Sequence, residues 1–187
     1  MSQSAAVDLL RGIGVILTPG LSDAEIVAAQ SAYGVQFGAD HREFLSEALP
    51  VGDRWFNWRD LDDDRIRAAI SWPLEGAHFD VENNEFWPTS WGARPSDERA
   101  RREVVDTQTS LWPQLVPLYG HRYLPAAPHG TRAPVLSVYQ TDVIVYGDDL
   151  LDYLHREFGA RARPDETRIT ATDLPPWTLL AFGHDIP

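Results

Sequence analysis

Residues 134–154 read PVLSVYQTDVIVYGDDLLDYL, and this stretch decides the fold of the chain. Two short runs of apolar and β-branched residues, 134–139 and 142–146, are separated only by Gln140 and Thr141. Such runs on either side of a two-residue break predict two strands that pair as a hairpin. Because a break this short leaves no room for a crossover, the strands must be antiparallel neighbours in the sheet.

The spacing of apolar residues changes from that of a strand to that of a helix directly after this hairpin. Either Asp148 or Asp149 can cap a helix that continues through Phe158, because an aspartate carboxylate accepts hydrogen bonds from the free N–H groups of the first turn. Gly159 then stands where a left-handed residue commonly ends a helix. The stretch therefore predicts a strand, a second strand and a helix in close succession.

The rest of the chain extends this pattern in both directions. Strand-like runs cover 115–119 and 122–124. Helical patterns cover 4–17, 22–33, 40–49, 61–70 and 96–110. We predict one α+β domain over residues 1–187, in which N-terminal helices pack on a mixed, mainly antiparallel sheet and a helix follows near the C-terminus. Residues 1–20 are expected to form a more loosely attached helix, and residues 174–182 to return over the core.

Composition limits the classes of function. The chain of 187 residues has the size of one domain that folds without disulfides or a structural metal, and it contains no cysteine, which excludes thiolate metal sites and cysteine nucleophiles. All 16 cationic residues are arginine, and the chain contains 28 Asp and Glu residues, so that the net charge is -12. A chain this acidic is a poor partner for nucleic acids and anionic membranes and favours a basic protein.

The apolar runs of the sequence predict a cytoplasmic protein. The N-terminus lacks the cationic start of a secretory signal, and no run approaches the roughly 20 apolar residues of a membrane span. We therefore expect no association with a membrane.

Motifs for catalysis or cofactor binding are not found in the sequence. The segment Asp60–Asp64 has the carboxylates of a calcium loop, but Arg65 stands at the sixth position, where such a loop needs glycine. No serine lies in a G-x-S-x-G elbow, no phosphate-binding glycine loop is present, and the six histidines lack paired ligand spacing. We predict no catalytic residue, metal or cofactor. The alternative is a metal-dependent hydrolase that uses Asp60–Asp64 with His78.

The middle of the chain combines acidic and aromatic residues. Residues 60–85 contain eight Asp and Glu residues and only two cationic residues, Arg65 and Arg67, which gives a local net charge of -6. Most tryptophans of this region are expected in the core, with one or two of Trp55, Trp58, Trp87 and Trp91 at a rim. We predict an acidic partner-binding face that consists of Asp60, Asp62, Asp63, Asp64, Glu75, Asp80, Glu82, Glu85, Trp87 and Trp91.

Two segments of the sequence resemble the SUKH superfamily, which contains fungal cell-wall assembly regulators and many bacterial immunity proteins. The first runs from Leu21 through Val35 to the DHREFL of residues 40–45, and is similar to the opening helices of the family. The second comprises GHRYLP at 120–125, then 134–147 and 149–154, and is similar to the strand, strand, helix ending of a bacterial branch. Residues 51–113 match nothing in the family, and Gln30 stands where the family often has Glu.

The resemblance implies an α+β fold without a catalytic centre and a role in binding another protein. Many bacterial members are thought to neutralise toxins, often nucleases, by direct binding. We therefore expect an immunity protein that binds a basic toxin domain, because an acidic surface competes for the cations with which a nuclease holds phosphates. An intracellular regulatory or scaffold protein is the alternative that the same resemblance leaves open.

Overall fold

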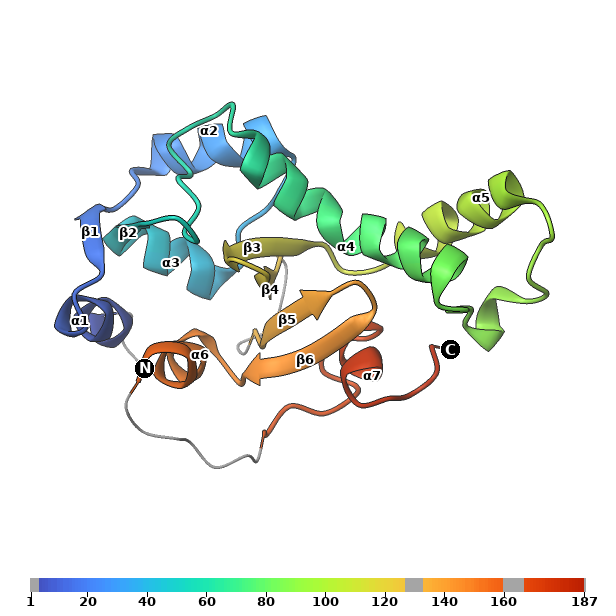
Figure 1. Ribbon diagram of the computed structural model, residues 1–187. Coiled ribbons are helices and arrows are strands. Elements are labelled where there is room, and N and C mark those ends of the chain that lie inside the picture. The colour runs from blue at the N-terminus through green and yellow to red at the C-terminus, as the bar shows by residue number, and fades with distance from the viewer. Residues whose placement is uncertain (1–3, 127–132, 160–166, 187) are drawn as a thin grey trace.

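A four-stranded sheet forms the centre of the computed structural model, which describes residues 4–126, 133–159 and 167–186 (Figure 1). Its strands follow one another in chain order as β3 (Leu115–Tyr119), β4 (Arg122–Pro125), β5 (Val135–Tyr139) and β6 (Asp142–Gly147). The predicted hairpin is confirmed, with Tyr139 opposite Asp142 and Gln140 in the left-handed region at the turn. The α+β class is confirmed as well. In the described chain every strand pair is antiparallel, so the sheet is not mixed.

A second, two-stranded sheet joins β1 (Ile16–Pro19) to β2 (Ala48–Val51), with Leu17 opposite Pro50. The predicted helices over 4–17 and 40–49 are therefore too long at their C-terminal ends. Gly12 and Gly14 weaken the end of the first helix, and Pro50 disfavours the helical conformation of the residue before it. Strand pairing satisfies the backbone groups that the shortened helices leave free.

The described residues form seven α-helices and one short 3-10 helix, Thr89–Trp91. The α-helices are α1 (Ser4–Gly12), α2 (Asp23–Tyr33), α3 (Ala39–Glu47), α4 (Asp64–Asn83), α5 (Glu98–Thr109), α6 (Leu150–Phe158) and α7 (Trp177–Ala181). None of the helices in these ranges combines the length and the apolar character that a membrane span requires.

The helix α4 is much longer than the helix predicted over 61–70. It even contains Pro73, although proline lacks the N–H group that a helix interior uses. Gly76 lets α4 pass the turn of the β5–β6 hairpin, because a Cβ atom at this position would lie 2.5 Å from the Cα atom of Gln140. Packing against other elements therefore extends the helix beyond its local signals.

Neighbouring residues of the strands belong to different hydrophobic clusters, because successive side chains point to opposite faces of a sheet. Leu124 and Val135 are part of the larger cluster, to which α1, α3 and α6 contribute. Tyr123 and Leu136 lie in a second cluster with Trp177 of α7. The segment 174–182 therefore covers the core, as predicted.

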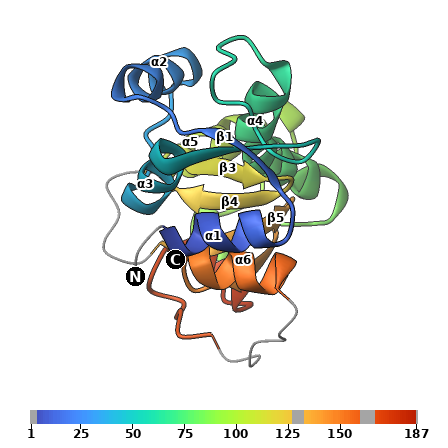
Figure 2. The same cartoon turned by 90° about the vertical axis from the view of Figure 1, so that its left-hand side faces the viewer.

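The helix α1 is packed onto the larger cluster, beside α6 (Figure 2). Its residues Ala6, Val7 and Leu10 are buried. The expected loose attachment of an N-terminal helix is therefore not found, because α1 buries its apolar face against α6 and α3.

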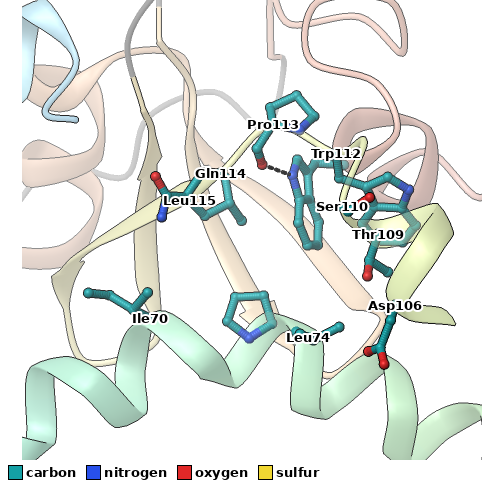
Figure 3. A pocket seen from close by; sticks show the side chains of 11 residues that line it. Ile70, Leu74, Asp106, Thr109, Ser110, Trp112, Pro113, Gln114 and Leu115 are labelled. Atoms are coloured by element: carbon teal, nitrogen blue, oxygen red, sulfur yellow. Dashed lines mark hydrogen bonds between the residues drawn. The ribbon is translucent and has the colours of Figure 1, made fainter. Parts of the chain in front are cut away.

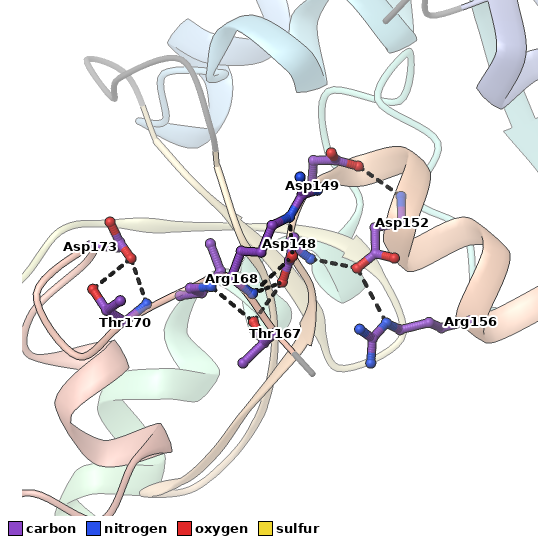
Figure 4. Close-up of polar contacts among 9 residues, drawn as sticks. Asp148, Asp149, Asp152, Arg156, Thr167, Arg168, Thr170 and Asp173 are labelled. Atoms are coloured by element: carbon purple, nitrogen blue, oxygen red, sulfur yellow. Dashed lines mark hydrogen bonds and ion pairs between the residues drawn. The ribbon is translucent and has the colours of Figure 1, made fainter. Parts of the chain in front are cut away.

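Two aspartates organise the start of α6 (Figure 4). Asp149, one of the two predicted candidates, caps the helix by accepting a hydrogen bond from the backbone N–H of Asp152 (2.8 Å). Asp148 accepts hydrogen bonds from the hydroxyl of Thr167 (2.5 Å) and from the backbone N–H and Nε of Arg168 (3.0 and 3.1 Å), and so holds the C-terminal segment. Burial alone would raise the pKa of Asp148, but these hydrogen bonds outweigh it and lower the pKa below its ordinary value.

The end of α6 differs from the prediction. Gly159 has an extended conformation (φ -80°), not a left-handed one. A Cβ atom at Gly159 would lie 2.2 Å from the carbonyl oxygen of His155. Glycine is therefore needed here for close approach to the last turn of the helix.

A buried histidine is the most unusual feature of the core. His41 of α3 is 1% exposed, and its ring lies edge-on to Phe37 and Trp58, with centroids 5.1 and 6.2 Å away. Neither ring nitrogen has a hydrogen-bond partner among the described residues. Burial therefore lowers the pKa of His41 to about 3, so the folded protein keeps this ring neutral.

We expect His41→Leu to make the fold less sensitive to acid. Below pH 6.5 the unfolded chain binds a proton at His41, whereas the folded chain does so only near pH 3, so stability is lost as the pH falls through this window. The loss amounts to about 2 kcal/mol by about pH 5, at ~1.4 kcal/mol per pH unit. Urea unfolding at several pH values measures it, and H41L should show the smaller decline.

The exposed residue His184 provides the control. H184L should keep the pH dependence of the wild type, because it removes an exposed histidine and leaves the buried His41 in place. The same decline in H41L and in the wild type would contradict a neutral, unpartnered His41.

Candidate functional site

The helices α4 and α5 form an arm that extends past the four-stranded sheet (Figure 1). A third hydrophobic cluster holds this arm together. It contains Ala77 and Val81 from α4, Val105 from α5, and Trp91 from the 3-10 helix between them. The arm is therefore a small packed unit and not a pair of free helices.

The tryptophans of the acidic, aromatic region lie mostly in the core, as predicted. Trp55, Trp58 and Trp91 are buried, and Trp87 is half-buried. Trp87 packs edge-on against Trp91, with centroids 5.3 Å apart, and its indole N–H donates to the carbonyl oxygen of Gly92 (2.8 Å). Of these four rings, Trp87 is the one that stays partly accessible to a partner.

A pocket of about 490 Å³ lies where the arm meets the sheet (Figure 3). We call it the arm pocket. Its lining is mostly apolar: α4 contributes Ile70, Pro73 and Leu74, and the segment between α5 and β3 contributes Trp112 and Pro113. The ring of Trp177 from α7 also lines it and meets Trp112 edge-on, with centroids 4.8 Å apart.

Most polar groups of the arm pocket are already hydrogen-bonded. The hydroxyls of Thr109 and Ser110 donate to backbone carbonyl oxygens of α5 (2.7 Å each). Asp106 is the one ionisable residue among the described residues that line the pocket, and its carboxylate lies 2.8 Å from Nε2 of His78. The pocket therefore presents a single carboxylate in an apolar setting.

The predicted acidic face is divided between the two ends of α4. The helix has 20 residues, so Asp64 and Asn83 lie about 28 Å apart along its axis. The predicted residues 60–64 lie at its start, whereas 80–91 lie at its far end. They do not form one compact face, because a helix of 20 residues separates them.

The aspartates before α4 have partners within the molecule. Asp63 caps α4 by accepting a hydrogen bond from the backbone N–H of Arg65 (2.8 Å). Asp62 and Asp64 both pair with Arg67 (2.7 and 3.2 Å). The carboxylate of the exposed residue Asp60 accepts a hydrogen bond from the backbone N–H of Asp62 (3.0 Å).

The arrangement that a metal-dependent hydrolase would need is not formed in the described part of the chain. His78 lies about 21 Å along α4 from Asp64, so it does not face the aspartates at 60–64. No group of three or more His, Asp or Glu side chains in the described ranges is placed to hold a metal ion.

The predicted residues beyond the middle of α4 are used in different ways. Glu82 pairs with Arg101 of α5 through both carboxylate oxygens (2.7 and 2.5 Å), and this hydrogen bonding lowers the pKa of Glu82 below its ordinary value. Glu75 is exposed and accepts a hydrogen bond from the hydroxyl of Ser71 (2.7 Å). Glu85 is exposed as well. The arginine of α5 thus offsets part of the local negative charge that the sequence predicts.

Asp80 is a structural residue and not part of an exposed face. Its side chain is 4% exposed and accepts hydrogen bonds from the backbone N–H and the hydroxyl of Thr141 (2.8 and 2.5 Å). It also accepts one from the side-chain amide of Asn84 (2.5 Å). Like Trp91, it is buried, and so these two residues must be removed from the predicted partner-binding set.

Sequence reasoning misses the arm pocket because separate segments build it. Its lining comes from α4, α5, the start of β3 and α7. The only signal in the sequence is the pair Trp112 and Pro113, directly after a predicted helix. Nothing in that local pattern predicts that α4 and Trp177 lie opposite.

We expect Asp80→Ala to destabilise the fold by about 2–4 kcal/mol, because it leaves the N–H group of Thr141 without its acceptor and loosens α4 from the sheet. The free energy of unfolding in urea measures this loss. Glu75→Ala, an acidic residue on the same helix that is exposed, should change stability by less than about 0.5 kcal/mol. Equal stability of D80A and E75A would contradict the structural role of Asp80.

Comparisons of the chain with protein-family models, with curated proteins and with solved structures find no significant match. Its function must therefore be inferred from the residues and the geometry of its sites.

Proposed function

We propose that this protein is a non-enzymatic binding protein that sequesters a basic protein partner, as an immunity protein of the SUKH type does with its toxin. The observation that carries the proposal is the arm pocket. Its walls are apolar and Asp106 is its one ionisable residue in the described chain, on a molecule with a net charge of -12. Such a hollow suits a side chain that is apolar along its length and cationic at its tip.

An arginine or lysine side chain of the partner has this form. Its methylene stem would pack on Pro73 and Leu74, and its cation would reach Asp106. The indole ring of Trp112 lines the same pocket, and an indole ring attracts a cation. Figure 3 shows Leu74, Asp106 and Trp112 around one space. Arginine and aromatic residues carry much of the binding free energy at protein interfaces, so this pocket would hold an anchor residue of the partner.

The net charge of the molecule adds to the local fit. A strongly negative protein attracts a basic partner over distance, and this steering raises the association rate at low salt. Glu75 and Glu85 are exposed on the arm and contribute to this field, although they do not form a single face. A toxin nuclease, which holds phosphates with cations, is the class of basic partner that the sequence resemblance favours.

The hydrogen bonds of the arm pocket support binding over covalent chemistry. A nucleophilic hydroxyl is normally hydrogen-bonded to a base that can take its proton. The hydroxyls of Thr109 and Ser110 instead donate to backbone carbonyl oxygens, and Nε2 of His78 is engaged with Asp106.

We expect Leu74→Arg to weaken capture of a basic partner without unfolding the protein. Leu74 is 40% exposed at the arm pocket, so an arginine there can remain solvated while it offsets Asp106 and repels a second cation. With the full chain as bait at about 0.1 M salt, capture should fall roughly tenfold. Val27→Arg, at an apolar position of α2 that is 57% exposed, is the matched control and should behave as the wild type does.

The properties of the captured partner decide the proposal. Two results would support it. The captured protein is basic and is lost at about 0.5 M salt, and its toxicity in cells is relieved by co-expression of the wild type but not of L74R. Equal capture by L74R and by the wild type would contradict the site. A partner that is not toxic would replace the immunity role with a regulatory one.

A further inference from the structure

A second hollow, of about 330 Å³, lies between the two-stranded sheet β1–β2 and the first turn of α4. We call it the β1–β2 pocket. Its described lining includes two arginines, Arg59 and Arg65, and no Asp or Glu. Such a lining is unusual for a chain in which acidic residues outnumber basic ones by 28 to 16. The pocket therefore has the opposite charge character to the arm pocket.

Arg59 is held in place by other parts of the protein. Its Nε donates to the carboxylate of Glu25 (2.7 Å), and its Nη2 donates to the carbonyl oxygens of Pro19 and Gly20 (2.8 Å each). A guanidinium has five N–H groups, and these bonds use three of them. The two N–H groups of Nη1 have no acceptor among the described residues, so a fixed donor pair remains for a ligand.

Arg65 supplies a second guanidinium that lacks a carboxylate partner in the described chain. Its Nη2 donates to the backbone carbonyl oxygen of Asp53. The nearest acids along the chain do not pair with this guanidinium, since Asp63 accepts a hydrogen bond from the backbone N–H of Arg65 and Asp64 pairs with Arg67. The remaining N–H groups of Arg65 can therefore donate to an incoming anion.

Apolar side chains form the other walls of the β1–β2 pocket. Trp55 is 7% exposed, and its ring is fixed by contacts with Tyr119 and Phe158, whose centroids lie 4.6 and 5.9 Å away. Leu49 and Val51 of β2 line the pocket beside it. A volume near 300 Å³ lies at the lower end of the range for small-molecule sites. The pocket thus suits a ligand with an anionic head and a small apolar body.

We propose that the β1–β2 pocket binds a small organic anion, whose carboxylate or phosphate group is held by Arg59 and Arg65 and whose apolar part lies against Trp55. The preformed position of Arg59 lowers the conformational cost of binding, because its side chain is already ordered by three hydrogen bonds. This site is separate from the arm pocket and does not depend on the proposed protein partner.

Calorimetric titration of the full chain with four probes tests the proposal. We expect benzoate or phenyl phosphate to bind, and the tighter of the two identifies the preferred head group. Benzyl alcohol should not bind, because it lacks the charge that the arginines recognise. Inorganic phosphate should bind more weakly than phenyl phosphate, because it cannot use the apolar wall.

The variant Arg65→Gln should weaken binding of the preferred anion roughly ten- to a hundredfold, because a charge-assisted hydrogen bond is lost. Arg99→Gln removes the same charge from an α5 side chain that is 87% exposed, and should bind as the wild type does. Unchanged binding in R65Q, binding of benzyl alcohol as tight as that of the anions, or no binding of either aromatic anion at millimolar concentration would each overturn the proposal.

Discussion

The contact between α4 and the turn of the β5–β6 hairpin is the constraint on which the rest of the structure depends. Gly76 lets the helix approach Gln140 closely, and one turn later the carboxylate of Asp80 accepts two hydrogen bonds from Thr141. Because a buried carboxylate is costly unless it is hydrogen-bonded, the pair specifies one position of the helix on the sheet. That position carries α5 with it and places both pockets, since each of them is bordered by α4.

The negative charge of the protein acts differently at short and at long range. Many acids of the central region have internal partners: Asp63 caps a helix, Asp62 and Asp64 pair with Arg67, and Glu82 pairs with Arg101. Local counting of acidic residues therefore overstates how much negative surface is free. The net charge of -12 still acts at a distance, where a partner experiences the summed field of all charges and not that of single ion pairs. A basic partner would thus be attracted by the whole molecule but recognised by one carboxylate in an apolar pocket.

The two pockets share a helix and differ in charge. The arm pocket places Asp106 among tryptophan, proline and leucine side chains, whereas the β1–β2 pocket places Arg59 and Arg65 beside Trp55. In both, a charged group lies next to an indole ring whose position is set by packing. This combination of a fixed apolar wall and few polar groups is what gives small sites their orientation and selectivity.

Local chemistry determined a large part of this fold from the sequence alone. The hairpin at Gln140 and Thr141 forms as predicted, and Asp149, one of the two predicted candidates, caps α6, because caps, turns and hydrophobic periods act within a few residues. Tertiary structure alone decided the pairing of β1 with β2, the length of α4 and the burial of Asp80. These features depend on contacts such as that between Asp80 and Thr141, which lie 61 positions apart, and no local pattern encodes such a distance. The same reason explains why both pockets escaped prediction, since each is lined by segments that only folding brings together.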